Sequence, residues 1–207
     1  MEDVLDLYAQ PYDAQRPVVC FDETSTQLLG EARPPIPAQP GQAQRYDYEY
    51  QRQGTRNLFL FCEPKRGWRH VAITQQRTRE DFAHQMRWLV DQAYPAIPVV
   101  RVVLDNLNTH RPASLYQAFP PPEARRIAQR LEFHYTPKHG SWLNMAEIEF
   151  SVFGRCILHR RIPSEDALER EVQALEQERN TASATINWRF STEDARTKLH
   201  RLYPCNN

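Results

Sequence analysis

The sequence predicts an α/β domain built on a mixed sheet, and three observations carry this prediction. Residues 17–21 and 99–104 are short, nearly continuous apolar runs rich in β-branched residues, the pattern of central strands covered on both faces. Residues 57–62 and 68–74 flank a turn and predict a β-hairpin. Segments with helical periodicity follow and alternate with these strands, as they do in α/β domains.

The remaining elements follow from helix caps and apolar spacing. Thr78, Ser164 and Ser191 are N-cap residues that predict three helix starts. A fifth strand is predicted at 131–135, with a helical patch between it and the fourth strand. An apolar stripe predicts a further helix over about 144–157.

Proline-rich stretches mark the long connections. Residues 34–41 contain four prolines and predict an extended loop of roughly fifteen residues, since proline runs neither pair in a sheet nor sit inside a helix. Three consecutive prolines at 120–122 predict a second break in the chain. A long loop inside a compact domain is usually functional or disordered.

Charge and hydropathy exclude several classes of protein. The 26 basic residues balance the 26 acidic ones, so any basic surface for a nucleic acid must be local. No run of 18 apolar residues predicts a membrane span, and the first ten residues do not have the pattern of a signal peptide. We therefore expect a cytoplasmic protein without membrane contact.

The four cysteines do not have metal-site spacing. None of them forms a CxxC pair, which argues against a structural zinc cluster. Cys20, Cys62 and Cys156 have apolar neighbours, so we expect them to be small core residues with free thiols in a reducing compartment.

Two of the predicted strands end in an aspartate, Asp22 after the first and Asp105 after the fourth. Sites in open α/β sheets lie at the carboxyl ends of strands. If these strands are parallel neighbours, the two carboxylates face each other, and close carboxylates favour a hard divalent cation such as magnesium. The alternative is that each aspartate only ends its strand or caps a turn.

The helix at 144–157 offers two candidates for a third acid, Glu147 and Glu149. They lie about 200° apart around the helix, so the helical wheel alone does not choose between them. With Asn144 as N-cap, Glu147 could instead close a capping box. Glu149 could be a charge on the shoulder of the helix that reaches solvent.

Three blocks of the chain resemble the catalytic blocks of DDE transposases, and most resemble the insertion sequence 630 group of the mariner superfamily. The blocks are Cys20-Phe21-Asp22-Glu23-Thr24, Leu104-Asp105-Asn106-Leu107-Asn108-Thr109-His110 and His139-Gly140-Ser141-Trp142-Leu143-Asn144-Met145-Ala146-Glu147. The resemblance extends from about residue 17 to residue 204. Three blocks in the right order are more specific than one pair of aspartates.

The resemblance implies a ribonuclease-H-like fold, with a mixed five-stranded sheet flanked by helices. It implies that Asp22, Asp105 and Glu147 are catalytic and bind two Mg²⁺ ions, with Mn²⁺ able to substitute; Glu149 is the alternative third acid. The implied activity is DNA cleavage at transposon ends, followed by strand transfer to target DNA. The implied partners are DNA and a second copy in a homodimeric active complex, in the bacterial cytoplasm at the nucleoid.

The chain departs from this family in two ways. Asp105 and Glu147 are 42 positions apart, more than in mariner-like enzymes, and we expect the extra residues to form a surface insertion at 120–130. Family members also carry an N-terminal helix-turn-helix region, whereas here Asp22 is only 21 residues from the start. We therefore expect one catalytic domain over 1–207, with 1–16 as lead-in, from a fragment, a split gene or a decayed copy.

Other residues carry weaker predictions about DNA. Arg155, Arg160 and Arg161 form a basic patch that could contact phosphates, or could merely end a helix favourably. Trp142 could stack on an unpaired base, although core packing is the commoner role. We also expect the loop at 34–41 to contact DNA or a partner subunit.

Two histidines near the blocks, His110 and His139, could assist proton transfer, and we favour a hydrogen-bonded structural role for both. Two rival functions remain for the whole chain: a ribonuclease-H-like nuclease without transposition, and an inactive module that only binds DNA or oligomerises.

Overall fold

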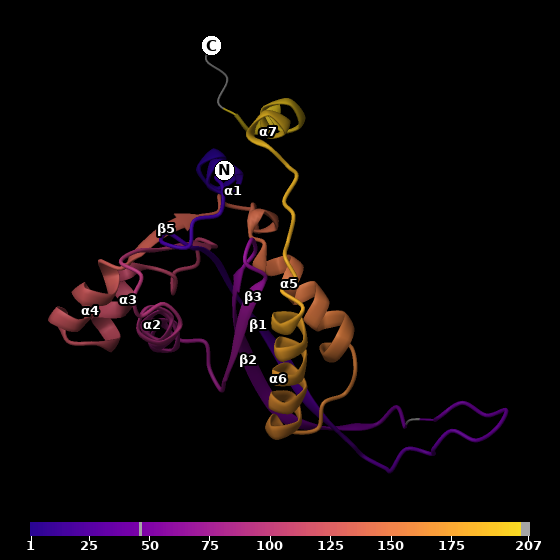
Figure 1. Cartoon of the computed structure of the whole chain (residues 1–207). Coiled ribbons are helices and arrows are strands. Elements are labelled where there is room, and N and C mark those ends of the chain that lie inside the picture. Colours follow the sequence, from indigo (N-terminus) through magenta and orange to yellow (C-terminus); the bar gives the residue numbers. More distant parts are fainter. Residues whose placement is uncertain (46, 204–207) are drawn as a thin grey trace.

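Five strands form one mixed sheet in the computed structural model, which describes residues 1–45 and 47–203 (Figure 1). The strands are β1 (Val18–Glu31), β2 (Tyr50–Glu63), β3 (Trp68–Thr74), β4 (Val100–Leu104) and β5 (Leu131–Tyr135). Their order across the sheet is β3-β2-β1-β4-β5. The predicted α/β class and the predicted hairpin of β2 and β3 are confirmed.

The first strand joins an antiparallel half of the sheet to a parallel half. β1 pairs antiparallel with β2, and β2 with β3, whereas β1–β4 and β4–β5 are parallel. In the parallel register, Cys20 of β1 lies opposite Val103 of β4. The condition stated for these two strands, that they are parallel neighbours, is therefore met, but β1 continues past its predicted end at Asp22 to Glu31.

Helices cover both faces of the sheet (Figure 1). They are α1 (Glu2–Ala9), α2 (Arg79–Trp88), α3 (Pro112–Ala118), α4 (Pro121–Ala128), α5 (Ala146–Phe153), α6 (Glu165–Thr181) and α7 (Thr192–Lys198). A π-helical turn extends α2 over Leu89–Ala93, and another extends α5 over Gly154–Leu158. Short 3₁₀ turns lie at Ser141–Leu143 and His200–Leu202.

The three predicted helix starts are confirmed. Each has a capping side chain, and a cap can be recognised from the few residues that follow it in the sequence. The side chains of Thr78, Ser164 and Ser191 each accept a hydrogen bond from a backbone N–H in the first turn. The first and the last of these caps are complete capping boxes. No helix of the described residues is long and apolar enough to cross a membrane.

The sheet separates two apolar cores. Phe21 and Phe61 belong to the core under α2, α3 and α4, whereas Cys20 and Leu60 belong to the core under α1, α5 and α6. This division follows from the alternation of side chains along a strand. By the same alternation, Asp22 belongs to the α5 face and Glu23 to the α2 face.

Two packing predictions need correction. Residues 120–130 are not a mere surface insertion: they contain the whole of α4, whose Ala124 and Ile127 are fully buried in the core. Cys156 is exposed, because it lies in the π-helical turn after α5, where the spacing of the apolar stripe changes. Cys20 and Cys62 are buried free thiols as predicted, and Cys205 lies outside the described residues.

A two-stranded arm projects from the body (Figure 1). We call residues 29–52 the arm. Here β1 and β2 continue beyond the strands predicted from the sequence, and a register shift after Gln27 separates this part from the rest of their pairing. At its tip, Gln39 and Gln42 exchange two backbone hydrogen bonds around Gly41, which has a φ of 80°. The predicted loop at 34–41 is thus the turn of a long hairpin.

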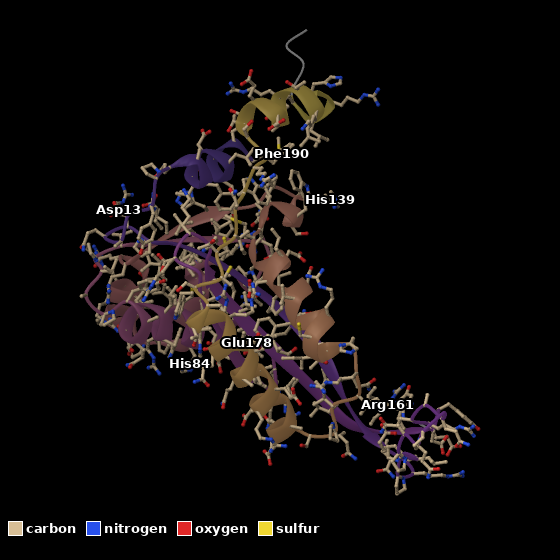
Figure 2. The ribbon with its side chains drawn as sticks, turned by 45° about the vertical axis from the view of Figure 1, so that its right-hand side comes forward. Asp13, His84, His139, Arg161, Glu178 and Phe190 are labelled. Atoms are coloured by element: carbon tan, nitrogen blue, oxygen red, sulfur yellow. The ribbon has the colours of Figure 1, made fainter. Side chains whose placement is uncertain are left out.

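Arg161 holds the arm at its base, where Figure 2 labels it. Its guanidinium lies 2.7 Å from the Glu31 carboxylate and donates hydrogen bonds to the backbone carbonyls of Tyr48 and Glu49 at 3.2 Å. It also lies over the ring of Tyr50. One side chain therefore ties both strands of the arm to the segment after α5.

Side chains of α6 cover the outer edge of β3. The amide of Asn180 accepts a hydrogen bond from the Arg69 N–H and donates one to the Arg69 carbonyl, both at 2.8 Å. Glu176 accepts a hydrogen bond from the Val71 N–H at 2.8 Å. Backbone groups that would otherwise be open at this edge of the sheet thus have partners.

Candidate active site

The sheet brings Asp22 and Asp105 to the point where β4 ends. The prediction that Asp22 ends its strand is wrong, because β1 continues to Glu31 in its pairing with β2. Asp22 lies in β1, two residues after Cys20, and Asp105 follows β4, two residues after the partner of Cys20 in the parallel register. The carboxyl group of Asp22 accepts a hydrogen bond from the Glu23 N–H at 2.8 Å. The side chain of Asp105 is 34% exposed, so one of the two carboxylates is open to solvent.

Asn144 fastens the start of α5 to the first strand beside Asp22. Its amide donates a hydrogen bond to the carbonyl of Phe21 at 2.8 Å, and its Oδ1 accepts one from the Ala146 N–H at 3.2 Å. The side chain is fully buried. The predicted capping box of Asn144 and Glu147 is therefore wrong, because the Asn144 amide is used by the strand and the helix starts one residue later, after Met145.

Glu147 lies in the first turn of α5 and is exposed. Its charge acts on Asp22 and helps to raise the pKa of that carboxyl group. Since no side-chain hydrogen bond fixes Glu147 among the described residues, its carboxylate is available at the site.

The pKa of Asp22 is raised to about 7. Burial is the largest cause, and the negative charges of Glu147, Glu23 and Asp105 add to it, whereas the hydrogen bond from the Glu23 N–H works in the other direction. Several carboxylates thus share one neighbourhood.

Glu149 has a different environment. It is fully buried, and its Oε1 lies 3.0 Å from Arg69 Nε and 2.5 Å from Arg179 Nε. Arg179 Nη2 donates a further hydrogen bond to Oε2 at 3.0 Å. The expectation that Glu149 reaches solvent is therefore wrong: on the β3 and α6 side of α5, two arginines use its oxygens in a buried ion-pair network.

A buried histidine joins Asp105 to Glu23. The ring of His110 is 1% exposed, with Nδ1 2.5 Å from Asp105 Oδ1 and Nε2 2.7 Å from Glu23 Oε2. Burial opposes the charged imidazolium, but the two carboxylates prevail and raise the pKa of His110 to about 9. Burial likewise works to raise the pKa of Asp105, but the hydrogen bond and the charge of His110, together with the hydrogen bond from the Leu107 N–H, outweigh it and lower that pKa. The predicted hydrogen-bonded role of His110 is confirmed.

Two open cavities adjoin the acids and share Ser141. The first is lined by Asp105, Asn106, Lys138 and His139, among others, and the second by Trp142, Glu147 and Ile148. Asp105 and Glu147 therefore face adjoining parts of one surface. Lys138 brings a positive charge to the cavity of Asp105, where a phosphate group would be attracted.

The donor set fits a hard divalent cation, although the side chains do not form a closed shell. Carboxylate oxygens are the ligands that magnesium prefers, and the raised pKa of Asp22 reflects negative charge that a cation would balance. Within residues 1–45 and 47–203, no three His, Cys, Asp or Glu side chains stand ready to hold a metal ion. Magnesium often takes only one or two carboxylates, with water or phosphate oxygens completing its coordination.

The predicted basic patch is only partly free. Arg155 is exposed, whereas Arg160 lies 2.5 Å from Glu171 and Arg161 holds the base of the arm. A role of these three side chains in DNA binding stays a prediction, and Arg155 is the one without an ion pair to break in the described part of the chain.

Trp142 is 45% exposed, and two aromatic side chains pack against its ring. Its ring stacks on Trp188 with centroids 6.4 Å apart and meets the edge of Phe190 at 5.4 Å. His139 is exposed, with a left-handed φ of 63°, and Figure 2 shows it near Phe190. The predicted structural hydrogen bond of His139 is absent from the described contacts.

Sequence reasoning missed three contributors to this surface. Asn144 follows Leu143 in the third block, and this pair is a signal in the sequence. Its hydrogen bond with the carbonyl of Phe21 joins residues 123 positions apart, so no local pattern predicts it. Glu23 and Lys138 lie next to recognised residues, and only the fold shows that Glu23 meets His110 and that Lys138 lines the cavity of Asp105.

Comparisons with known proteins identify relatives of this fold. The family model described as "DDE superfamily endonuclease" matches residues 17–169. No curated protein sequence matches the chain. Among solved structures, the Mos1 mariner paired end complex with Mn is similar, with a TM-score of 0.50, 15% identity, and coverage of 90% of this chain and 60% of that one. The Mos1 strand transfer complex has a TM-score of 0.53, 12% identity, and coverage of 90% and 61%.

Proposed function

Because the chain belongs to the DDE superfamily of endonucleases, we propose that it is the catalytic domain of a transposase of the insertion sequence 630 group, with Asp22, Asp105 and Glu147 as its catalytic carboxylates. The domain spans 60% and 61% of the two mariner chains that it resembles. The proposal covers cleavage at transposon ends and strand transfer to target DNA.

The observation that carries this proposal is the parallel pairing of β1 and β4. This pairing brings Asp22 and Asp105 to the point where β4 ends, and Asn144 fastens the helix of Glu147 to β1 beside them. The raised pKa of Asp22 supports a cation-dependent site, since burial and three neighbouring acids leave its charge poorly compensated. Glu147 is favoured over Glu149, whose oxygens are used by arginines.

In this proposal the three carboxylates hold two Mg²⁺ ions, with Mn²⁺ as a substitute. Bound divalent cations would activate the attacking oxygen and stabilise the leaving one during phosphoryl transfer. Water first attacks the scissile phosphorus and the 3′ oxygen leaves, which frees a 3′-hydroxyl. That hydroxyl then attacks a target phosphorus, and the 3′ oxygen of the target strand leaves as a new 3′-hydroxyl.

DNA and a second copy are the proposed partners. Lys138 and Arg155 are placed to contact phosphates, Trp142 to stack on an unpaired base, and the arm to reach beyond the body toward DNA or the other subunit of a homodimer (Figure 1). The proposed location is the bacterial cytoplasm, at the nucleoid.

We expect Asp22→Asn, Asp105→Asn and Glu147→Gln each to reduce Mn²⁺-dependent nicking of supercoiled DNA by at least about 100-fold. A metal ion supplies several kcal/mol of transition-state stabilisation, and each 1.36 kcal/mol is a factor of ten in rate. The measurement is the initial rate of nicking on a gel, with circular dichroism to check that each variant folds.

Glu178→Gln is the matched control, because Glu178 is an exposed acid on α6 away from the site (Figure 2). Nicking that survives all three substitutions would overturn the proposal. Nicks without joined strand-transfer products would favour a nuclease that does not transpose. Metal-independent DNA binding without nicking would favour an inactive module.

Arg155→Ala is expected to weaken DNA binding several-fold and to reduce the salt slope of binding by about 1, as loss of one phosphate contact does. Arg160→Ala is the matched comparison, since its guanidinium already pairs with Glu171, and a smaller effect is expected there. Fluorescence anisotropy at several salt concentrations measures both. An unchanged slope for Arg155→Ala would remove this residue from the proposed DNA surface.

A further inference from the structure

The imidazole of His110 is buried between two carboxylates. Its ring is packed between Phe21 and Phe82, with centroids 5.3 and 5.0 Å away, and it is 1% exposed. One ring nitrogen lies 2.5 Å from Asp105 Oδ1 and the other 2.7 Å from Glu23 Oε2. A single imidazole thus connects the end of β4 to the residue after Asp22.

The loop that carries Asp105 is fixed at several further points. The Leu107 N–H donates to Asp105 Oδ1 at 3.3 Å, and the His110 N–H donates to the carbonyl of Leu107 at 3.0 Å. The hydroxyl of Tyr135 donates to the carbonyl of His110 at 2.8 Å. Both the ring and the backbone of His110 are therefore held in place, so the ring can act as a rigid support.

Burial decides what kind of role the ring can have. A general acid or base must come within hydrogen-bond reach of the reacting atoms. The ring of His110 is enclosed by Phe21 and Phe82, and both its nitrogens face carboxylates. It therefore has no route to a substrate and acts only through the acids that it touches.

We propose that His110 is a positioning residue that fixes the carboxylate of Asp105 for cation binding, with Glu23 as the anchor that fixes His110. The inference rests on the proposed function, because it assigns Asp105 as a ligand. Hydrogen-bond partners of ligating side chains orient them, and their removal typically weakens metal binding 10- to 100-fold. The imidazole contacts Oδ1 of Asp105 and leaves Oδ2 for the cation.

Two substitutions of His110 separate its two contacts. The amide nitrogen of an asparagine replaces the ring nitrogen that faces Asp105, whereas that of a glutamine replaces the one that faces Glu23. His110→Asn therefore keeps the support of Asp105, and His110→Gln removes it. Glu23→Gln keeps the contact between His110 and Asp105 and weakens only the anchor.

The experiment is a titration of the full chain with Mn²⁺ alone, without DNA, followed by electron paramagnetic resonance of the free ion. Thermal unfolding of each variant is recorded in parallel. We expect His110→Gln to weaken Mn²⁺ binding by about 10- to 100-fold, Glu23→Gln by less, and His110→Asn least. Restoration by the asparagine is the signature of positioning, which a purely structural role would not produce.

Two outcomes overturn the inference. One is Mn²⁺ affinity that stays at the wild-type value in folded His110→Gln and Glu23→Gln. The other is equal weakening by the glutamine and asparagine variants in proportion to their loss of thermal stability. Asp105→Asn distinguishes this failure from failure of the proposed function: if it leaves Mn²⁺ binding unchanged, Asp105 is not a ligand and the proposed function fails.

Discussion

Replacing Asp22 by asparagine is expected to stabilise the metal-free protein at pH 8 by about 2 to 4 kcal/mol, at 1.36 kcal/mol per unit of pKa shift. In the folded chain the pKa of Asp22 is raised from 3.8 to about 7. The fold therefore favours the protonated carboxyl, and this contribution to stability is full below pH 4 and is lost as the pH rises to about 7. An asparagine carries no charge at any pH.

The expected gain is therefore small at pH 4 and reaches its full size above pH 7. Urea unfolding at both values, with a chelator present, measures the difference between the variant and the wild type. Glu178→Gln, a substitution at an exposed side chain of α6, is the control variant. A pH-independent difference for Asp22→Asn would mean that the fold does not disfavour the charged carboxylate. A gain in stability together with a loss of nicking would be the trade-off expected of a charged active site.

Arg69→Ala is expected to destabilise the protein by about 3 to 5 kcal/mol, the usual cost of breaking a buried ion pair from one side. Arg69 is 1% exposed and Glu149 is fully buried, with Nε and Oε1 3.0 Å apart. The same guanidinium donates to the carbonyls of Gly67 and Ala184. The substitution would leave β3, α5 and the segment after α6 without their common partner. Urea unfolding measures the resulting loss in the free energy of unfolding.

A double-mutant cycle tests whether the pair is the cause. Arg69→Met and Glu149→Leu together should lower the free energy of unfolding by less than the sum of the losses from the two single substitutions. In the double variant no buried charge lacks its main partner. Arg179 keeps 22% exposure and can turn toward water. Additive losses would show that the two side chains contribute by packing alone.

Local signals predicted much of this fold. Thr78, Ser164 and Ser191 mark helix starts because a capping side chain needs only the next three residues. The segments at 17–21 and 99–104 predicted two buried strands because a continuous apolar run suits a strand covered on both faces, and the structure adds that the two strands are parallel neighbours. The proximity of Asp22 and Asp105 then follows from the parallel arrangement.

Features that depend on distant residues could not be predicted. A helical wheel does not choose between Glu147 and Glu149, and only the contacts with Arg69, 80 residues earlier, and Arg179, 30 residues later, make Glu149 part of a structural ion-pair network. The arm was missed because its two strands pair with each other outside the body of the domain, so its residues lack the apolar pattern of a covered strand. Asn144 seemed to be a helix cap because its partner Phe21 belongs to another part of the chain.

The hydrogen bonds from α6 to β3 also bear on how the protein behaves when it is concentrated or partly unfolded. An open sheet edge is a template for strands of other molecules and thus a route to aggregation. Asn180 and Glu176 use the Arg69 and Val71 backbone groups that such a strand would need. Unfolding of α6 would therefore expose unpaired backbone groups of β3, at the edge of the sheet opposite β5. The solubility of the protein thus depends on a helix that contributes no residue to the proposed active site.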